Sequence, residues 1–248
     1  MLNKFYAIAF FLFMMAFMGC QWKLASHDND NLGQEFIIER YDVIERQFLT
    51  TGDFAALQEL KTLYPTETRT LIEDVLCLGQ VNEDDINSRF LMYFQDSTLQ
   101  TIIHDVDLEF ANLDDISQNL GKAFGHLQKL LPNLVIPKVY TQIGSLNQSI
   151  IISDGLLGIS LDKYLGQDYP SYIKFDYSKQ QREMMTRDAI IPDCIGFYLL
   201  SVYPNANKTV VQWTINHCMG KKVYDNPEIE QFDNFVKTAK KFKLELAL

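Results

Sequence analysis

The stretch "SIIISDGLLGISLDKYLGQDYP", Ser149–Pro170, decides the fold, because it holds two apolar runs joined by a short polar segment. The β-branched run Ile150–Ile152 predicts one strand, and the run Leu156–Leu161 predicts a second. The dipeptide Asp154-Gly155 between them favours a tight hairpin turn. Gly158 lies inside the second strand, where a neighbouring segment can approach closely. The stretch therefore predicts an antiparallel hairpin.

The chain then changes from strand to helix. Asp162 directly precedes "KYLG", so its carboxylate can cap a short helix at Lys163–Leu165, which Gly166 can end in a left-handed conformation. The same density of glycine and aspartate is also compatible with a loop that binds a metal ion or a phosphate. Turn and cap chemistry explains Asp154 and Asp162 without a ligand, so we predict no metal site and no cofactor.

Strand and helix patterns extend outward from this hairpin. The run "LVIPKVYTQIG" at 134–144 predicts another strand, and "EFIIERYD" at 35–42 predicts a first one. Asp53 can cap a helix that Pro65 ends, and residues 82–131 carry the apolar spacing of three helices.

Helical patterns return after the hairpin. The pattern from Ser178 to Tyr203 contains Pro192, which must kink or divide the helix. Further helices are predicted at 209–224 and 227–246. The strands are few and clustered, so we predict an α+β fold: a helical half followed by a small, mostly antiparallel sheet flanked by helices.

The N-terminus has the features of an export signal. Lys4 precedes an uncharged apolar run, Phe5–Met18, that is too short to span a bilayer comfortably, since about 20 residues are needed. Gly19 and Cys20 follow at once, as at a bacterial lipoprotein cleavage site. We therefore predict a lipoprotein signal peptide at 1–19 and lipidation of Cys20, although an ordinary signal peptide with a chance cysteine is the alternative.

The rest of the chain reads as a tether and one domain. Residues 20–34 include the polar stretch "SHDNDNLGQ" and predict a lipidated tether, and residues 35–248 predict a single α+β domain. No block of acidic residues follows Cys20, which favours an outer-membrane protein that faces the periplasm. The net charge of −10 repels nucleic acid, so membrane attachment and envelope protein partners are expected instead.

Established catalytic motifs are absent from the sequence. The four histidines include no H-E-x-x-H zinc motif, and neither G-x-S-x-G nor a P-loop occurs. We therefore predict a non-enzymatic protein with no catalytic residues. One alternative is an envelope hydrolase whose carboxylates would be Asp154, Asp162, Asp168 and Asp193. Another is a glycan-binding lipoprotein whose aromatic residues would be Tyr164, Tyr169, Tyr172 and Tyr177.

Several segments together resemble the GldB family of gliding-motility lipoproteins. They are the lipoprotein start, "IERYD", "PKVYTQIG", "IIISDGLLGISLDKYLGQDYPSY" and "AIIPDCIGFYL". The resemblance implies an envelope lipoprotein tied to gliding motility or to the associated secretion machinery. It supplies no catalytic residues, and the lipid-bearing Cys20 is the functional residue that carries over.

A fold-level analogy suggests a further hypothesis. Zinc metallopeptidases place H-E-x-x-H on a helix beside a substrate-binding strand, whereas the equivalent helix here carries Pro192–Gly196, "PDCIG", without histidine. We therefore consider a metallopeptidase-like scaffold that lacks the zinc motif and keeps its groove for binding.

Overall fold

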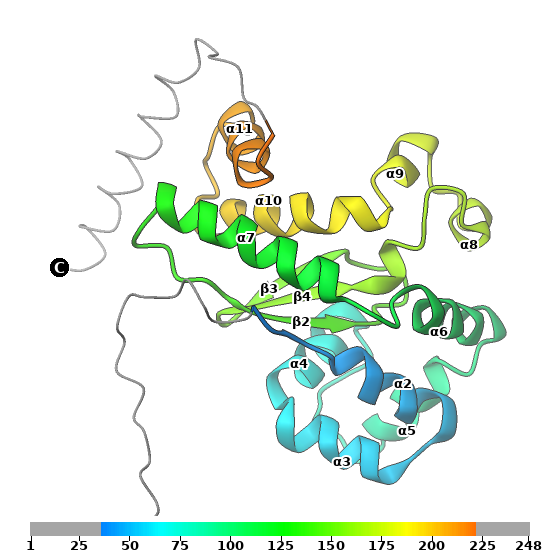
Figure 1. The fold of residues 1–248 in the computed structure, drawn as a ribbon. Coiled ribbons are helices and arrows are strands. Elements are labelled where there is room, and N and C mark those ends of the chain that lie inside the picture. The colour runs from blue at the N-terminus through cyan, green and yellow to red at the C-terminus, as the bar shows by residue number, and fades with distance from the viewer. Residues whose placement is uncertain (1–35, 222–248) are drawn as a thin grey trace, which may run out of the picture. The chain divides into compact units, whose positions relative to one another are not determined.

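The computed structural model describes residues 36–221, which form one α+β body (Figure 1). The longer helices are α2 (Tyr41–Thr51), α3 (Phe54–Leu63), α5 (Ile86–Tyr93), α6 (Ser97–Glu109), α7 (Asp114–Leu130), α10 (Ile190–Val202) and α11 (Lys208–Cys218). Short helices are α4 (Pro65–Arg69), a π-helix (Thr70–Val75), two 3₁₀ turns (Leu161–Lys163 and Arg187–Ala189), α8 (Pro170–Lys174) and α9 (Lys179–Glu183). The α+β class is confirmed.

Four strands form one sheet: β1 (Ile38–Glu39), β2 (Lys138–Gln142), β3 (Ile150–Ser153) and β4 (Leu156–Ser160). Their order is β1-β2-β4-β3, with β1–β2 and β2–β4 parallel and β3–β4 antiparallel. The sheet is therefore mixed, with a larger parallel share than the sequence suggested. The reason lies in the connection after β2. It places β3 two positions away from β2 in the sheet, and β4 then occupies the position between them, parallel to β2.

The predicted hairpin turn is present. Asp154 and Gly155 have φ angles of 48° and 78°, and Ser153 pairs with Leu156 across the turn. Both central residues have positive φ angles, as a two-residue hairpin turn of type I′ requires. Asparagine, aspartate and glycine tolerate that conformation best.

The close approach predicted at Gly158 is made by β2. Gly158 lies opposite Tyr140 of β2, and a Cβ atom there would sit 2.6 Å from the Tyr140 ring. The buried Tyr140 ring therefore occupies the space above Gly158 and packs edge-on against Tyr41 of α2. The missing side chain at Gly158 thus leaves room on β4 for the Tyr140 ring of β2.

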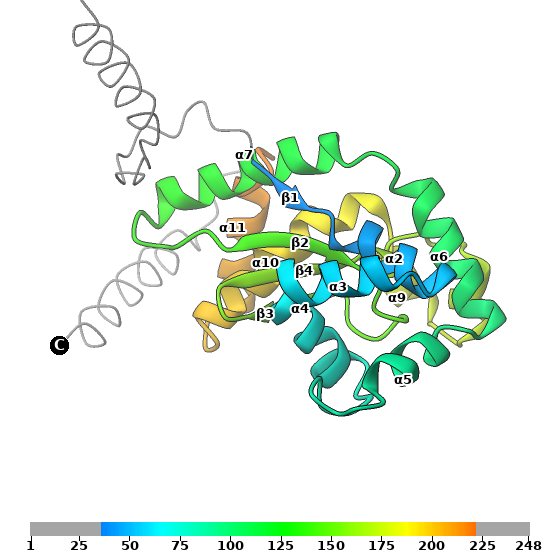
Figure 2. The same cartoon turned by 90° about the horizontal axis from the view of Figure 1, so that it is seen from below.

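Helices cover both faces of the sheet. Figure 1 shows α7 and α10 on one face and α2, α3 and α4 on the other, and α11 packs against α7 and α10. Seen from the perpendicular direction, α7 lies near β1, and β3 is at the opposite edge of the sheet (Figure 2).

The helix boundaries follow the sequence signals closely. Three helices occupy the segment 82–131, and the Asp53 side chain accepts the N–H of Ala55 at 2.8 Å at the start of α3. Pro192 lies in the first turn of α10, where its missing N–H costs no intrahelical bond. The 178–203 segment is divided as predicted, but the break between α9 and α10 lies before Pro192, at residues 184–189, and not at the proline itself.

Near the N-terminus the prediction needs a correction. The first strand contains Ile38–Glu39 rather than all of 35–42, because helix α2 already begins at Tyr41. The signal peptide, the tether with Cys20, and the helix predicted at 227–246 lie outside the described residues. Within 36–221, no helix has the length and apolar character needed to cross a membrane.

Candidate functional site at the carboxyl ends of the parallel strands

A cluster of buried polar side chains lies where β2 and β4 end, and α2 packs against it. We call it the buried polar cluster: Asp42, Glu45, Thr141, Gln142, Ser160 and Asp162, each at most 4% exposed. The carboxyl ends of parallel strands are where open α/β sheets most often bind ligands. Buried polar groups in an otherwise apolar core require specific partners.

The loop between β2 and β3, Ile143–Ser149, has unusual backbone geometry beside this cluster. Ser145 and Leu146 have φ angles of 53° and 62°, although neither is glycine, and the Leu146 side chain is buried. Left-handed conformations at such residues cost about 1–3 kcal/mol each. The surrounding groups must therefore hold the loop in place.

Two carboxylates bind the N–H groups of this loop. Asp162 accepts the N–H of Gly144 at 2.8 Å and the N–H of Leu146 through its second oxygen. Glu45 accepts the N–H of Ile143 at 2.8 Å. The strained loop is thus fixed by side chains from α2 and from the turn after β4.

The backbone carbonyl of Leu146 is also bound by side chains. Its carbonyl accepts the Tyr177 hydroxyl at 2.7 Å and the Lys163 ammonium at 3.2 Å. Lys163 also lies 4.4 Å from the centre of the Tyr177 ring. Both backbone polar groups of Leu146 are therefore satisfied by remote side chains.

Burial dominates the electrostatics of the two carboxyl groups. It raises the pKa of Glu45 well above its ordinary value, and the nearby Asp162 and Asp42 raise it further. Burial also raises the pKa of Asp162, opposed by the loop N–H groups that favour the anion. Among the described residues, Glu45 Oε1 and Gln142 Oε1 are buried polar atoms without a hydrogen-bond partner. Burial and the unpaired Oε1 therefore both disfavour the charged form of Glu45.

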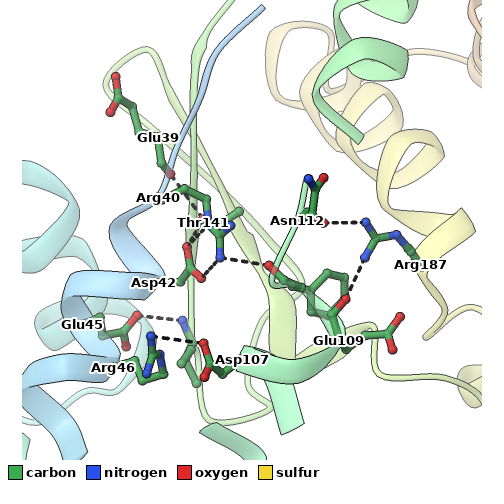
Figure 3. A network of polar contacts seen from close by, with 12 residues as sticks. Glu39, Arg40, Asp42, Glu45, Arg46, Asp107, Glu109, Asn112, Thr141 and Arg187 are labelled. Atoms are coloured by element: carbon green, nitrogen blue, oxygen red, sulfur yellow. Dashed lines mark hydrogen bonds and ion pairs between the residues drawn. The ribbon is translucent and has the colours of Figure 1, made fainter. Parts of the chain in front are cut away.

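Ion pairs extend from the cluster toward α6 (Figure 3). Arg40 donates two hydrogen bonds of 2.8 Å to Asp42, and its guanidinium also donates to the Phe110 carbonyl at 3.0 Å. Thr141 donates to Asp42, and Arg46 pairs with Asp107 at 3.1 Å. These contacts attach α2 to β2 and to the end of α6.

Arg187 binds the same end of α6 from the opposite side, as Figure 3 shows. Its guanidinium donates to the carbonyls of Glu109 at 3.1 Å and Asn112 at 2.9 Å, and pairs with Asp115 at 2.7 Å. It also lies 5.2 Å from the centre of the Phe110 ring. Carbonyls at a helix end lack intrahelical partners, so these arginines stabilise the α6–α7 connection.

Asp162 has a different role from the predicted one. It lies inside the 3₁₀ turn Leu161–Lys163 and binds the β2–β3 loop, so it does not cap its own helix. Gly166 has the expected positive φ, 108°, but its N–H donates to the Met185 carbonyl at 2.9 Å. A buried carboxylate satisfies several backbone donors more effectively than an exposed cap, which explains the difference.

The remaining aspartates of the hydrolase alternative have separate partners. Asp168 is exposed and lies 3.8 Å from Arg182. Asp154 is in the hairpin turn and, with Glu67 and Lys138, lines an open cleft of about 490 Å³. Asp193 accepts the Tyr164 hydroxyl at 2.9 Å, and burial raises the pKa of Asp193 to about 6.

The tyrosines of the glycan-binding alternative contact the domain itself. The Tyr169 hydroxyl donates to Asp105 at 2.7 Å. Tyr172 is fully buried, donates to the Asp162 carbonyl at 2.6 Å, and stacks edge-on against Tyr169 and Tyr177. Tyr164 is also buried. These rings pack the segment after β4 onto the body.

Comparison with known proteins identifies the family. A protein-family model described as gliding motility protein GldB matches residues 25–226. The chain belongs to the GldB family. No curated protein and no solved structure matches it.

The sequence patterns revealed only Asp162 of the six residues in the buried polar cluster of this GldB-family chain. Asp42 and Glu45 lie on the buried stripe of α2, next to Tyr41, Phe48 and Leu49. Acidic residues at the apolar positions of an amphipathic helix were the available signal. That signal requires α2 to be recognised first.

The metallopeptidase-like scaffold remains a hypothesis for this family member. Asp193 lies in the first turn of α10, and α10 packs over β3 and β4. Within the described part of the chain, no group of three or more histidine, cysteine or acidic side chains is placed to hold a metal ion.

Proposed function

We propose that this GldB-family chain is a non-catalytic component of the cell envelope that serves gliding motility, or the associated secretion machinery, by binding other envelope proteins. Acyl chains on Cys20 would attach it to the outer membrane, with the domain facing the periplasm. The family itself is one of gliding-motility proteins, and its match over residues 25–226 is the observation that carries the proposal.

The contacts of the polar residues favour structural roles over catalytic ones. Asp162 and Glu45 use their carboxylates to hold the β2–β3 loop, and Asp193 is occupied by Tyr164. An enzyme would instead bring acid, base and substrate space together.

Lipid attachment is tested by changing Cys20. Cys20→Ala should abolish labelling by radioactive palmitate and release the protein from membranes, because stable anchoring needs the acyl chains. Cys77→Ala is the matched control, since Cys77 is an exposed free cysteine elsewhere in the chain. Sedimentation of the Cys20→Ala protein with membranes after a high-salt wash would disprove the anchor.

Orientation is tested with protease. Proteinase K added to intact cells should leave the protein whole, and permeabilising the outer membrane should allow its digestion. Digestion in intact cells would show that the domain faces outward instead.

The non-catalytic role is tested by complementation. Deleting the gene should reduce gliding or protein secretion in cells that show them. A double variant, Asp154→Asn with Asp168→Asn, should restore the phenotype as fully as the wild-type gene. Failure of that variant at normal protein levels would favour the hydrolase alternative.

A further inference from the structure

One edge of the sheet has no neighbouring strand. β3 pairs with β4 on one side only, and it is the last strand in the order β1-β2-β4-β3. Ile152 at its centre is partly exposed, while Ile150 and Ile151 are buried.

The alternation of hydrogen-bonded and non-hydrogen-bonded residue pairs shows which backbone groups of β3 point away from β4. Ser160 donates its N–H to the Ser149 carbonyl at 3.0 Å, so these two residues form a hydrogen-bonded pair. Such pairs alternate along antiparallel strands, so Ile151 and Ser153 also bond to β4, and the N–H and C=O groups of Ile150 and Ile152 point away from it. Outside the sheet, no segment between residues 36 and 221 hydrogen-bonds to those groups.

This edge is short, at four residues, but it lacks the other usual devices against pairing. Natural edge strands carry charges, prolines or bulges that prevent the addition of another strand. The β3 segment "IIIS" contains no charge and no proline, and its register with β4 continues without a bulge. The strand is therefore suited to accept an extended polypeptide.

Helix α10 supplies a flank beside this edge. Ile151 lies opposite Gly158, on the face where Tyr140 packs against α2, so alternation places Ile150 and Ile152 on the face covered by α10.

The same helix packs against β3, β4, α7 and α11, yet three of its large apolar side chains remain exposed. They are Phe197, 47% exposed, Leu200, 39% exposed, and Val202, 38% exposed, at the end of the helix. Asp193 is one turn before Phe197 on the same stripe of the helix.

We propose that the β3 edge and the exposed stripe of α10 bind an extended segment of another envelope polypeptide, which adds to the sheet as a fifth strand. Its backbone would bond to Ile150 and Ile152, and its alternate apolar side chains would contact Phe197 and Leu200. A lysine or arginine of the segment would reach Asp193. This inference rests on the proposed binding role and names its partner class.

Charge favours a foreign segment over a second copy of this chain. Each copy carries a net charge of −10, so two copies repel each other, whereas a segment with basic residues is attracted. β-strand addition draws affinity from main-chain hydrogen bonds and specificity from alternate side chains. Both sources are present along this edge.

The test removes one outward N–H without disturbing the sheet. Ile152→Pro eliminates the donor that faces away from β4, a position where edge strands tolerate proline. Ile152→Val keeps the donor and serves as the matched control. Equal melting temperatures and circular dichroism spectra would show that both variants fold.

The probe is a library of phage-displayed random dodecapeptides, panned on the full chain in detergent with counter-selection on Ile152→Pro. We expect enrichment of peptides with alternating apolar residues and a basic residue. Synthetic copies should bind Ile152→Pro at least tenfold more weakly than wild type, and Ile152→Val within about twofold. Asp193→Asn should reduce the affinity for peptides that carry the basic residue.

Backbone methylation tests the geometry directly. N-methylation of alternate amides in one register should abolish binding, and methylation in the other register should preserve it. The proposal is overturned if no peptide is enriched, if Ile152→Pro binds the peptides as well as wild type, or if both registers behave alike. A wild-type dimer that Ile152→Pro converts to monomer would also overturn it, by assigning the edge to a second copy. The Cys20 experiment tests the anchor independently of all these outcomes.

Discussion

The two connections of β3 adopt similar backbone conformations for different reasons. The β2–β3 loop has two successive left-handed residues, Ser145 and Leu146, at φ 53° and 62°. The β3–β4 turn also has two, Asp154 and Gly155, at φ 48° and 78°. The turn contains residues that favour this conformation, whereas serine and leucine do not.

The loop is held by groups that are distant in the sequence. Asp162 and Glu45 bind its N–H groups, and Tyr177 binds its Leu146 carbonyl. The turn needs only its own residue types. One backbone conformation can therefore be specified by local residue types, as in the turn, or imposed by tertiary contacts, as in the loop.

The largest effect is expected at Asp162. Asp162→Ala should reduce the free energy of unfolding by about 2–6 kcal/mol, because two buried N–H groups lose their acceptor at about 1–3 kcal/mol each. Asp154→Ala is the matched control at the turn, and it should cost only about 1–2 kcal/mol, the penalty of a left-handed alanine. Urea unfolding measures both. Equal losses would show that the loop is specified as locally as the turn.

Glu45 gives the loop a distinct pH dependence. Because its pKa is raised in the folded protein, its contribution to stability is present below about pH 4.5 and is lost as the pH rises through the folded value. Glu45→Gln should therefore become more stable relative to wild type as the pH rises from 5 to 8, by up to about 1.4 kcal/mol per pH unit. Glutamine can still accept the N–H of Ile143. If urea titrations gave the same difference in the free energy of unfolding between the two proteins at every pH, the pKa of Glu45 would not be raised in the folded protein.

This comparison also shows how far the sequence predicts the structure. The hairpin at Asp154-Gly155 and the cap at Asp53 were predictable, because each depends on neighbouring residues. The pairing of β2 with β4 was not predictable, since it brings together Tyr140 and Gly158, which are distant in the sequence.

The candidate site was less predictable than the fold. Asp162 was identified, but its role as a ligand of the β2–β3 loop depends on residues 16 and 18 positions away. Glu45 is farther still, 98 positions from Ile143. Local patterns reveal caps and turns, whereas buried carboxylates that bind distant backbone require the tertiary structure.

A smaller effect is expected at Tyr177. Tyr177→Phe removes the hydroxyl that donates to the Leu146 carbonyl and should cost about 0.5–1.5 kcal/mol. Lys163 still donates to that carbonyl, so the loss is partial. Tyr93→Phe is the control, because the Tyr93 hydroxyl forms a solvent-exposed hydrogen bond of 3.0 Å with the Ser145 hydroxyl, and its loss should cost less. If thermal melts showed a larger loss of stability for Tyr93→Phe than for Tyr177→Phe, the proposed role of the Tyr177 hydroxyl in holding Leu146 would be contradicted.

The smallest effect is expected at the turn itself. Asp154→Asn should change the free energy of unfolding by no more than about 0.5 kcal/mol, since Asn-Gly and Asp-Gly both favour this turn. A metal loop would respond differently, because asparagine carries no charge and would weaken cation binding, and a chelator would destabilise the wild-type protein. Melting curves of wild type and Asp154→Asn should therefore coincide with and without EDTA. A chelator-dependent drop in the wild type alone would show that the aspartate has a role beyond the backbone geometry of the turn.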